Sequence, residues 1–428
     1  MACCKTRPKT FTRPPDGGWG WFVVAGSLVT RLLIYGNLSL AGVIISSLQS
    51  SMPSTSAVDI VLVTSIYFGL MFFVCPIGIY FNDRYGTRPV MIIGSALSTI
   101  GLFLSFFAFN IYHLCISYGV LTGIGHGFLI ATNLVMLARY FEKQFALATG
   151  IACTGAGLGY FLFPPMTQIF VDNYGLYGAF LILSAINSHA FACALVMRPI
   201  NITCQDQEKQ NTDVSTDRCC KTIIKGLGFQ LLCTNHNFAL LMMAAFIVDI
   251  SYLISLTLII PHAIDTGVAA LKASFLVTAM GIASLSTRLV QGWFVDKGYI
   301  RPIYLLPIVL LIMGAAQLSI ALISIFPAMV VSCVLLGACD GIYIPALFVG
   351  MKDIVGATNY SRGNGIALLA MGIAGIIGTQ AGGWIFDSTG SFQIIFYLAA
   401  ICSLVSAVLF CATAARVRKQ DAYAVETI

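Results

Sequence analysis

The sequence contains few charged residues. They make up only 9% of its 428 residues, whereas hydrophobic residues make up 58%. An ordinary soluble domain carries about 25% charged residues, so this chain has too few charges to cover a water-exposed surface. The mean hydropathy of +0.90 points the same way. These values argue against a water-soluble enzyme and a nucleic-acid-binding protein, and they indicate lipid as the solvent of most of the chain.

Several functional motifs are also missing. The sequence has no G-x-x-x-x-G-K-[S/T] loop, which argues against a pump driven by ATP. Its 14 cysteines form no C-x-x-C pair and no Cys/His set at zinc spacing, so we expect neither a metal nor another cofactor. The polar, basic N-terminus lacks the apolar core of a cleavable signal peptide.

Long apolar runs dominate what is present. A helix needs about 20 apolar residues to cross the hydrocarbon core of a bilayer, and lipid forces each segment to close its own backbone hydrogen bonds. The alternating pattern of membrane-barrel strands is absent. We therefore predict an all-α membrane protein with twelve transmembrane helices, at residues 19–47, 58–81, 89–109, 113–138, 145–171, 176–197, 237–262, 272–295, 302–323, 328–352, 362–387 and 391–414.

One long polar stretch divides the predicted helices into six and six. The predicted parts are an N-terminal tail (1–18), an N-terminal half (19–197), a central loop (198–236), a C-terminal half (237–414) and a C-terminal tail (415–428). Cytoplasmic loops collect Lys and Arg. If the N-terminus is cytoplasmic, nearly all of the 23 basic residues fall on that side. We therefore expect both tails and the central loop to be cytoplasmic.

The two halves resemble each other in sequence. Gly150-Ile151-Ala152 recurs as Gly365-Ile366-Ala367, and Asp172 recurs as Asp387, in each case 215 residues later. A constant offset at several places is hard to obtain by chance. Two six-helix repeats of this kind are typical of transporters.

Four charged residues fall near the middle of predicted helices: Arg31, Asp249, Arg288 and Asp340. A charge at the bilayer centre costs at least about 2.5 kcal/mol, so it usually faces a partner or water and marks function. Arg288 is our candidate for binding a substrate carboxylate, because guanidinium is a planar, two-pronged donor. The alternative is a structural ion pair with Asp249 or Asp340.

The other three charges have candidate roles as well. Either Asp249 or Asp340 is a candidate carrier of a coupled proton, with a fixed salt bridge as the alternative. Arg31 is a candidate second anion contact, or else a structural partner of Asp249. His126 is a candidate proton relay, although a packed histidine with satisfied hydrogen bonds is the competing interpretation. Further candidates for polar lining of the same site are Tyr35, Asn37, Asn133, Tyr252 and Gln380.

Charged loops follow the second and the eighth predicted helix. Their aspartates, Asp83 and Asp296, are 213 residues apart. We interpret these loops as cytoplasmic ion-pair gates, the alternative being that their basic residues only set the topology. The gate candidates are Asp83, Arg84, Gly86, Arg88, Asp296 and Lys297.

Asp16-Gly17-Gly18-Trp19-Gly20-Trp21 stands directly before the first predicted helix. It resembles the first signature of the monocarboxylate transporter family, a branch of the major facilitator superfamily. Residues 140–159 resemble the second signature of that family. The resemblance implies the major facilitator fold with two six-helix halves, and Arg288 matches the substrate-binding arginine of the family. Ser39 and Ser284 replace the lysine and aspartate of its proton–lactate members.

The resemblance implies a plasma-membrane secondary transporter that is not an enzyme. It would move a small organic anion bearing a carboxylate by alternating access, with a proton as a candidate co-substrate. The alternatives are a facilitated-diffusion carrier of an amino acid, a creatine-like or another organic solute, and a non-transporting solute sensor on the same fold. The expected partners are this solute, the lipid bilayer and, as in some family members, a single-span glycoprotein chaperone.

Overall fold

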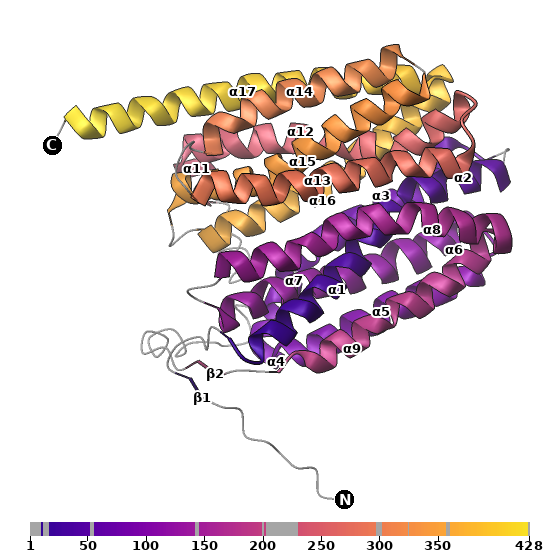
Figure 1. Ribbon diagram of the computed structural model, residues 1–428, viewed down its shortest axis with the longest axis horizontal. Coiled ribbons are helices and arrows are strands. Elements are labelled where there is room, and N and C mark those ends of the chain that lie inside the picture. Colours follow the sequence, from indigo (N-terminus) through magenta and orange to yellow (C-terminus); the bar gives the residue numbers. More distant parts are fainter. Residues whose placement is uncertain are drawn as a thin grey trace, which may run out of the picture.

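The computed structural model describes residues 10–11, 17–51, 55–141, 145–198, 201–202, 230–296, 302–323, 325–356 and 360–426. Almost all of these residues are helical, and the helices lie in two neighbouring groups that follow the sequence (Figure 1). The N-terminal half contains α1 (Gly20–Ser39), α2 (Ala41–Ser51), α3 (Ala57–Phe73), α4 (Cys75–Tyr85), α5 (Thr87–Phe106), α6 (Ile111–Leu114), the π-helix η1 (Cys115–Thr122), α7 (Gly123–Tyr140), α8 (Phe145–Asn187) and α9 (His189–Val196).

The C-terminal half contains α11 (Gln230–Thr234), α12 (His236–Asp265), α13 (Ala270–Asp296), α14 (Pro302–Leu322), α15 (Phe326–Val355), α16 (Tyr360–Thr389) and α17 (Phe392–Glu426). The final helix therefore continues well past residue 414. Two short parallel strands, β1 (Thr10–Phe11) and β2 (Asn201–Ile202), pair the N-terminal tail with the central loop.

Eleven helical stretches among the described residues are long and apolar enough to cross a membrane. The longest, Ala148–Val196, has 49 residues and includes Gly175, whose φ of 73° and ψ of 171° are not helical. This positive φ is easily adopted only by glycine, so the backbone turns there and the stretch supplies two crossings. The predicted all-α membrane protein with twelve spans in two six-helix halves is thereby confirmed.

The bundle has two ends, which lie left and right in Figure 1. Strand β1 and the C-terminal end of α17 lie at the left end in Figure 1, which we call the terminal end, and the other is the distal end, near α2 and α6. The turns at Gly175 and Gly390, with φ of 73° and 65°, are also at the distal end.

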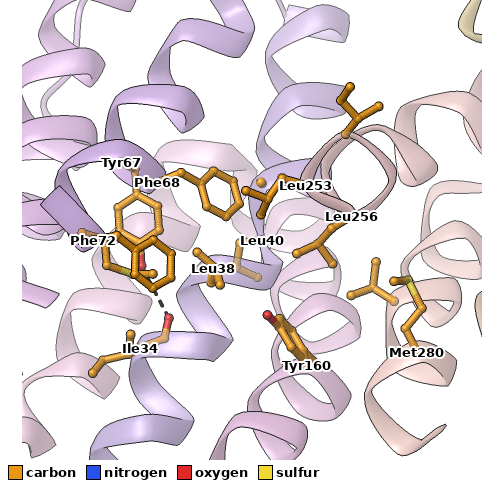
Figure 2. Packing of buried hydrophobic residues seen from close by; sticks show 14 of the residues in the cluster. Ile34, Leu38, Leu40, Tyr67, Phe68, Phe72, Tyr160, Leu253, Leu256 and Met280 are labelled. Atoms are coloured by element: carbon orange, nitrogen blue, oxygen red, sulfur yellow. Dashed lines mark hydrogen bonds between the residues drawn. The ribbon is translucent and has the colours of Figure 1, made fainter. Parts of the chain in front are cut away.

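Apolar side chains from both halves meet in the middle of the bundle. Figure 2 shows Phe68 of α3 and Leu40 near Leu253 and Leu256 of α12. In lipid, close packing rather than hydrophobicity drives helices together, and small residues permit it. Gly281 of α13 is one example, because a Cβ atom there would lie 2.8 Å from the backbone nitrogen of Phe161.

The outer surface is apolar as well. Ile100 of α5, Ile308 of α14 and Val408 of α17 expose 51%, 57% and 68% of their surface. Large exposed apolar patches are rare on soluble monomers, whereas hydrocarbon solvates them without cost. A lipid environment therefore accounts for this apolar outer surface. Charged side chains are placed instead inside the bundle or at its ends.

Candidate substrate site

Arg288 of α13 pairs with Asp340 of α15. The Arg288 Nη2 atom donates to Asp340 Oδ2 at 3.0 Å, and the Ser284 hydroxyl donates to the same oxygen at 2.8 Å. The Arg288 side chain keeps 17% exposure and that of Asp340 keeps 5%. Of the two carboxylates considered as partners of Arg288, the structure places Asp340 beside it.

Arg31 of α1 projects from the other half. Its Nη1 atom lies 3.5 Å from the Cys153 thiol of α8. Within the part of the chain that the structure describes, no carboxylate lies within ion-pair distance of Arg31, so the suggested pair with Asp249 is not formed there. The Nε atoms of Arg31 and Arg288 are both buried without a hydrogen-bond partner.

Three tyrosines lie close to Arg288. Tyr35 of α1 is in electrostatic contact with both Arg31 and Arg288. Its ring meets the ring of Tyr160 of α8 edge-on, with centroids 6.1 Å apart. Tyr252 of α12 interacts with Tyr160 in turn. Both tyrosines interact electrostatically with Arg288 and Asp340.

These contacts join groups from both halves into one cluster, which we call the central site. Its members are Arg31, Tyr35, Cys153 and Tyr160 from the N-terminal half, and Tyr252, Ser284, Arg288 and Asp340 from the C-terminal half. Two guanidinium groups and several hydroxyl donors suit a small organic anion. The site therefore has the chemistry to bind a carboxylate between the two halves.

Asp249 of α12 lies next to the central site but is not paired with an arginine there. It is 3% exposed, and its Oδ1 atom accepts a 3.3 Å hydrogen bond from the Tyr343 hydroxyl of α15. Asp340 is close enough to repel it electrostatically. Among the residues with described side chains, no cation pairs with Asp249, so its carboxyl group is not committed to a salt bridge.

His126 lies inside the N-terminal half. Its Nδ1 atom is 2.7 Å from the Tyr67 hydroxyl, and its Nε2 atom is 3.1 Å from Asn187 Oδ1. Both Asn187 amide hydrogens are directed to Ser98 and Thr99, so the amide oxygen accepts and Nε2 carries the proton. Nδ1 then accepts from Tyr67, which gives a fully bonded neutral ring within the packing of α3, α7 and α8.

Three other predicted lining residues make their described hydrogen bonds elsewhere. The side-chain amides of Asn37 and Asn133 donate to carbonyls one turn earlier in their own helices. Gln380 of α16 donates to the Val58 carbonyl of α3 at 3.1 Å. Gln380 thus bridges the two halves near the distal end, apart from the central site.

The tryptophan signature lies at the terminal end of the bundle. Trp19 Nε1 donates to the Val196 carbonyl at 2.9 Å, and the Arg198 guanidinium stacks 3.7 Å from the Trp19 ring centroid. Arg88 donates to the Leu195 carbonyl at 2.8 Å, and the Tyr140 hydroxyl donates to the Arg198 carbonyl at 2.9 Å. Carbonyls at a helix end lack partners within the helix. These bonds satisfy those at the end of α9, and we call this group the α9 clamp.

The rest of the signature packs nearby. The Trp21 ring meets Phe141 edge-on with centroids 5.3 Å apart, and a Cβ atom on Gly20 would lie 2.8 Å from the same ring. Gly18 has a φ of 58°, a backbone conformation that favours glycine. A Cβ atom added to Gly17 would have no neighbouring atom within 4 Å. Asp16 lies outside the described residues.

The predicted loop gate is described only in part. Arg84 donates to the Tyr80 hydroxyl at 3.2 Å, and Gly86, with a φ of 87°, separates α4 from α5. Lys297 lies outside the described residues, as do the side chains of Asp83 and Asp296. The gate therefore stays a prediction.

Several members of the central site were not predicted as such: Cys153, Tyr160 and Ser284, together with Tyr343 beside Asp249. They are uncharged and do not stand out in a sequence of apolar helices. The available signal was spacing, since Ser284 precedes Arg288 by one helical turn and Tyr343 follows Asp340 by nearly one.

Comparisons with known proteins agree with this architecture. Residues 27–314 and 241–425 match the Major Facilitator Superfamily. The chain is 28% identical to monocarboxylate transporter 11 of Homo sapiens over 90% of its own length and 81% of that protein. It is 30% identical to monocarboxylate transporter 13 of Rattus norvegicus, over 91% and 87% of the two chains.

The fold also matches solved structures. A POT family transporter crystallised with 5-aminolevulinic acid superposes with a TM-score of 0.75, covering 94% of this chain and 98% of that one at 14% identity. That similarity concerns the fold alone. Together with the sequence matches, it shows that the chain is a carrier of the Major Facilitator Superfamily and belongs to its monocarboxylate transporter family.

Proposed function

We propose that this membrane transporter moves a small carboxylate-bearing solute across the plasma membrane by alternating access, with both termini in the cytoplasm. The relatives are named monocarboxylate transporters, and the positive-inside rule supports the orientation. The observation that carries the proposal is the placement of Arg31 and Arg288, one from each half, around Tyr35.

Unsatisfied donors explain why this site favours an anion. A buried polar group without a partner costs about 1–3 kcal/mol, and more if charged. The Nε atoms of Arg31 and Arg288 are two such groups. A substrate carboxylate would accept from them in charge-assisted hydrogen bonds, which are about twice as strong as those to a neutral carbonyl. Arg31 contributes most directly, because one donor of the Arg288 guanidinium is already hydrogen-bonded to Asp340.

Binding between the halves couples the substrate to the motion. A carboxylate held by Arg31 and Arg288 contacts both halves, so its binding affects their relative position. The gate candidates (Asp83, Arg84, Gly86, Arg88, Asp296 and Lys297) would then control cytoplasmic access. Such rocking of repeats around a fixed site is the usual route of alternating access.

Proton symport is the favoured mode, and Asp249 is the proposed proton carrier. Its carboxyl group has a hydroxyl partner rather than a cation, whereas Asp340 is held by Arg288. Facilitated diffusion of an amino acid, a creatine-like or another organic solute is the second candidate. It is favoured by Ser39 and Ser284, which stand where proton-linked relatives have charged residues.

The test is uptake of a labelled carboxylate panel by liposomes containing the purified chain, with and without an inward proton gradient. We expect at least one monocarboxylate to enter faster than into protein-free liposomes, and the gradient to increase its accumulation. Entry without a gradient effect would identify facilitated diffusion. If no member of the panel or of a matched amino-acid set enters, the transport proposal fails and a sensor role is favoured.

A further inference from the structure

Asp387 joins the two halves at the distal end. It lies at the end of α16, and its carboxylate accepts hydrogen bonds from the first turn of α3 in the other half. The Ala57 amide donates to Oδ1 at 2.8 Å and the Val58 amide donates to Oδ2 at 3.0 Å. The Ser56 hydroxyl donates to Oδ2 at 2.5 Å. The N-cap of a helix is normally supplied by its own chain segment. Here the Asp387 carboxylate, which belongs to the other half, provides a second cap.

The charge of Asp387 suits this position. The first amides of a helix have no partner within the helix and carry the positive end of its dipole. A carboxylate that accepts from them forms charge-assisted hydrogen bonds, which are stronger than neutral ones. Separating α16 from α3 breaks all three contacts at once.

Other hydrogen bonds also join the two halves. The hydroxyls of Ser65 in α3 and Thr379 in α16 are 2.7 Å apart. On the other interface, the Thr278 hydroxyl of α13 donates to the Phe161 carbonyl of α8 at 3.0 Å. The halves are thus bonded together along both interfaces, and among these described bonds those of Asp387 involve a charge.

The internal repeat shows that this contact is formed on one side only. Asp172 of α8 corresponds to Asp387 at the 215-residue offset. Its described hydrogen bond comes from Gln168 of its own helix, at 2.8 Å. At the 213-residue offset, the residue corresponding to Ser56 is Ala269, which has no hydroxyl to donate. The repeated aspartate therefore bonds across the halves at α3 and α16 and not at α8 and α13.

We infer that Asp387 is a positioning residue of the transport cycle, a latch that holds the distal end closed through Ser56, Ala57 and Val58. The inference rests on the proposed alternating access. When the halves rock to open the distal end, the α3 amides and the Asp387 carboxylate separate and become hydrated. The latch stabilises the closed arrangement and leaves the substrate site itself untouched.

Hydrogen–deuterium exchange of the full chain in lipid nanodiscs tests the latch without any substrate. Asp387→Asn removes the charge and keeps the size of the side chain. Loss of a helix cap changes an equilibrium by about three- to tenfold. We expect exchange to rise by that factor in α3 and also in α2, which packs against α12 of the other half and makes none of the described hydrogen bonds to Asp387.

Asp172→Asn is the matched control, because it changes the repeat-related aspartate that lacks this contact, and it should leave exchange in α2 and α3 unchanged. Ser56→Ala removes one of the three contacts together with the N-cap bond that Ser56 accepts from Val58, so if Asp387→Asn does not fold, a rise of exchange in α2 after Ser56→Ala is the readout. A rise confined to the first turn of α3 would identify a local cap and overturn the latch. Unchanged exchange in folded Asp387→Asn would overturn it as well. Since no substrate is added, neither result depends on carboxylate transport.

Discussion

Breaking the ion pair between Arg288 and Asp340 should destabilise the protein more than removing it altogether. Losing one partner of a buried pair leaves an uncompensated charge and costs about 3–5 kcal/mol. Arg288 keeps 17% exposure, so we expect the lower end, about 3 kcal/mol, for Asp340→Leu. The double variant Arg288→Met with Asp340→Leu removes both charges of the pair, so neither is left without its partner. Its stability should approach that of the parent.

The assay is a thermal unfolding series of the purified chain in one detergent, followed by intrinsic fluorescence. Asp340→Leu should lower the melting temperature by several degrees and the double variant should recover most of that loss. Ser284→Ala is the control, since it removes one hydroxyl hydrogen bond to the Asp340 carboxylate and should cost about 1.5 kcal/mol, less than the loss of a partner of the pair. If the stability losses of Asp340→Leu and Arg288→Met, each measured singly, simply add in the double variant, the pairing argument is refuted. Additivity would mean that the two side chains do not interact.

Three further predictions concern Asp249, the α9 clamp and His126. Asp249→Asn should flatten the pH dependence of uptake, because it removes the carboxyl group that no described cation neutralises; an intact pH response would assign the proton elsewhere. Trp19→Phe should lower the melting temperature by an amount equivalent to about 1 kcal/mol, because it loses the donor to Val196. Trp21→Phe is its control, and equal effects of the two would contradict the α9 clamp. His126→Ala should remove the acceptor of the Tyr67 hydroxyl and the donor to the Asn187 amide oxygen, and so lower stability without changing the pH dependence of uptake; a changed pH response would instead support a proton relay.

Most of the fold was predictable because lipid imposes simple rules. Apolar runs of sufficient length must be helices, and the polar stretch 198–236 separates them into two sets. The observed ends differ from the predicted ones by a few residues at most helices, but α17 continues to Glu426. Turn residues such as Gly175 explain how one continuous helical stretch contains two predicted spans.

The central site was predictable in its charges and in two lining tyrosines, Tyr35 and Tyr252. Arg31, Arg288 and Asp340 stood out because charge is rare in the membrane, but their partners depend on which helix faces meet. Sequence could not choose between Asp249 and Asp340 as the partner of Arg288, which the packing of α13 against α15 decides.

Neutral residues were harder to predict. Tyr160 looks like any aromatic residue of a membrane helix until its contacts with Tyr35 are known. In the sequence, Asp387 stood out only because it repeats Asp172 at the 215-residue offset. Its bonds to Ser56, Ala57 and Val58 arise only because α16 and α3 lie side by side.

The central claim is that a substrate carboxylate binds Arg31 at the interface of the two halves. Uptake by Arg31→Gln liposomes, measured with the carboxylate that the panel identifies, tests it most directly, because Arg31 has no described carboxylate partner whose loss would disturb the fold. We expect uptake to fall at least about tenfold, since a charge-assisted hydrogen bond contributes about 1.5–3 kcal/mol, while the melting temperature stays unchanged. Full uptake by a stable, correctly inserted Arg31→Gln variant would contradict the claim.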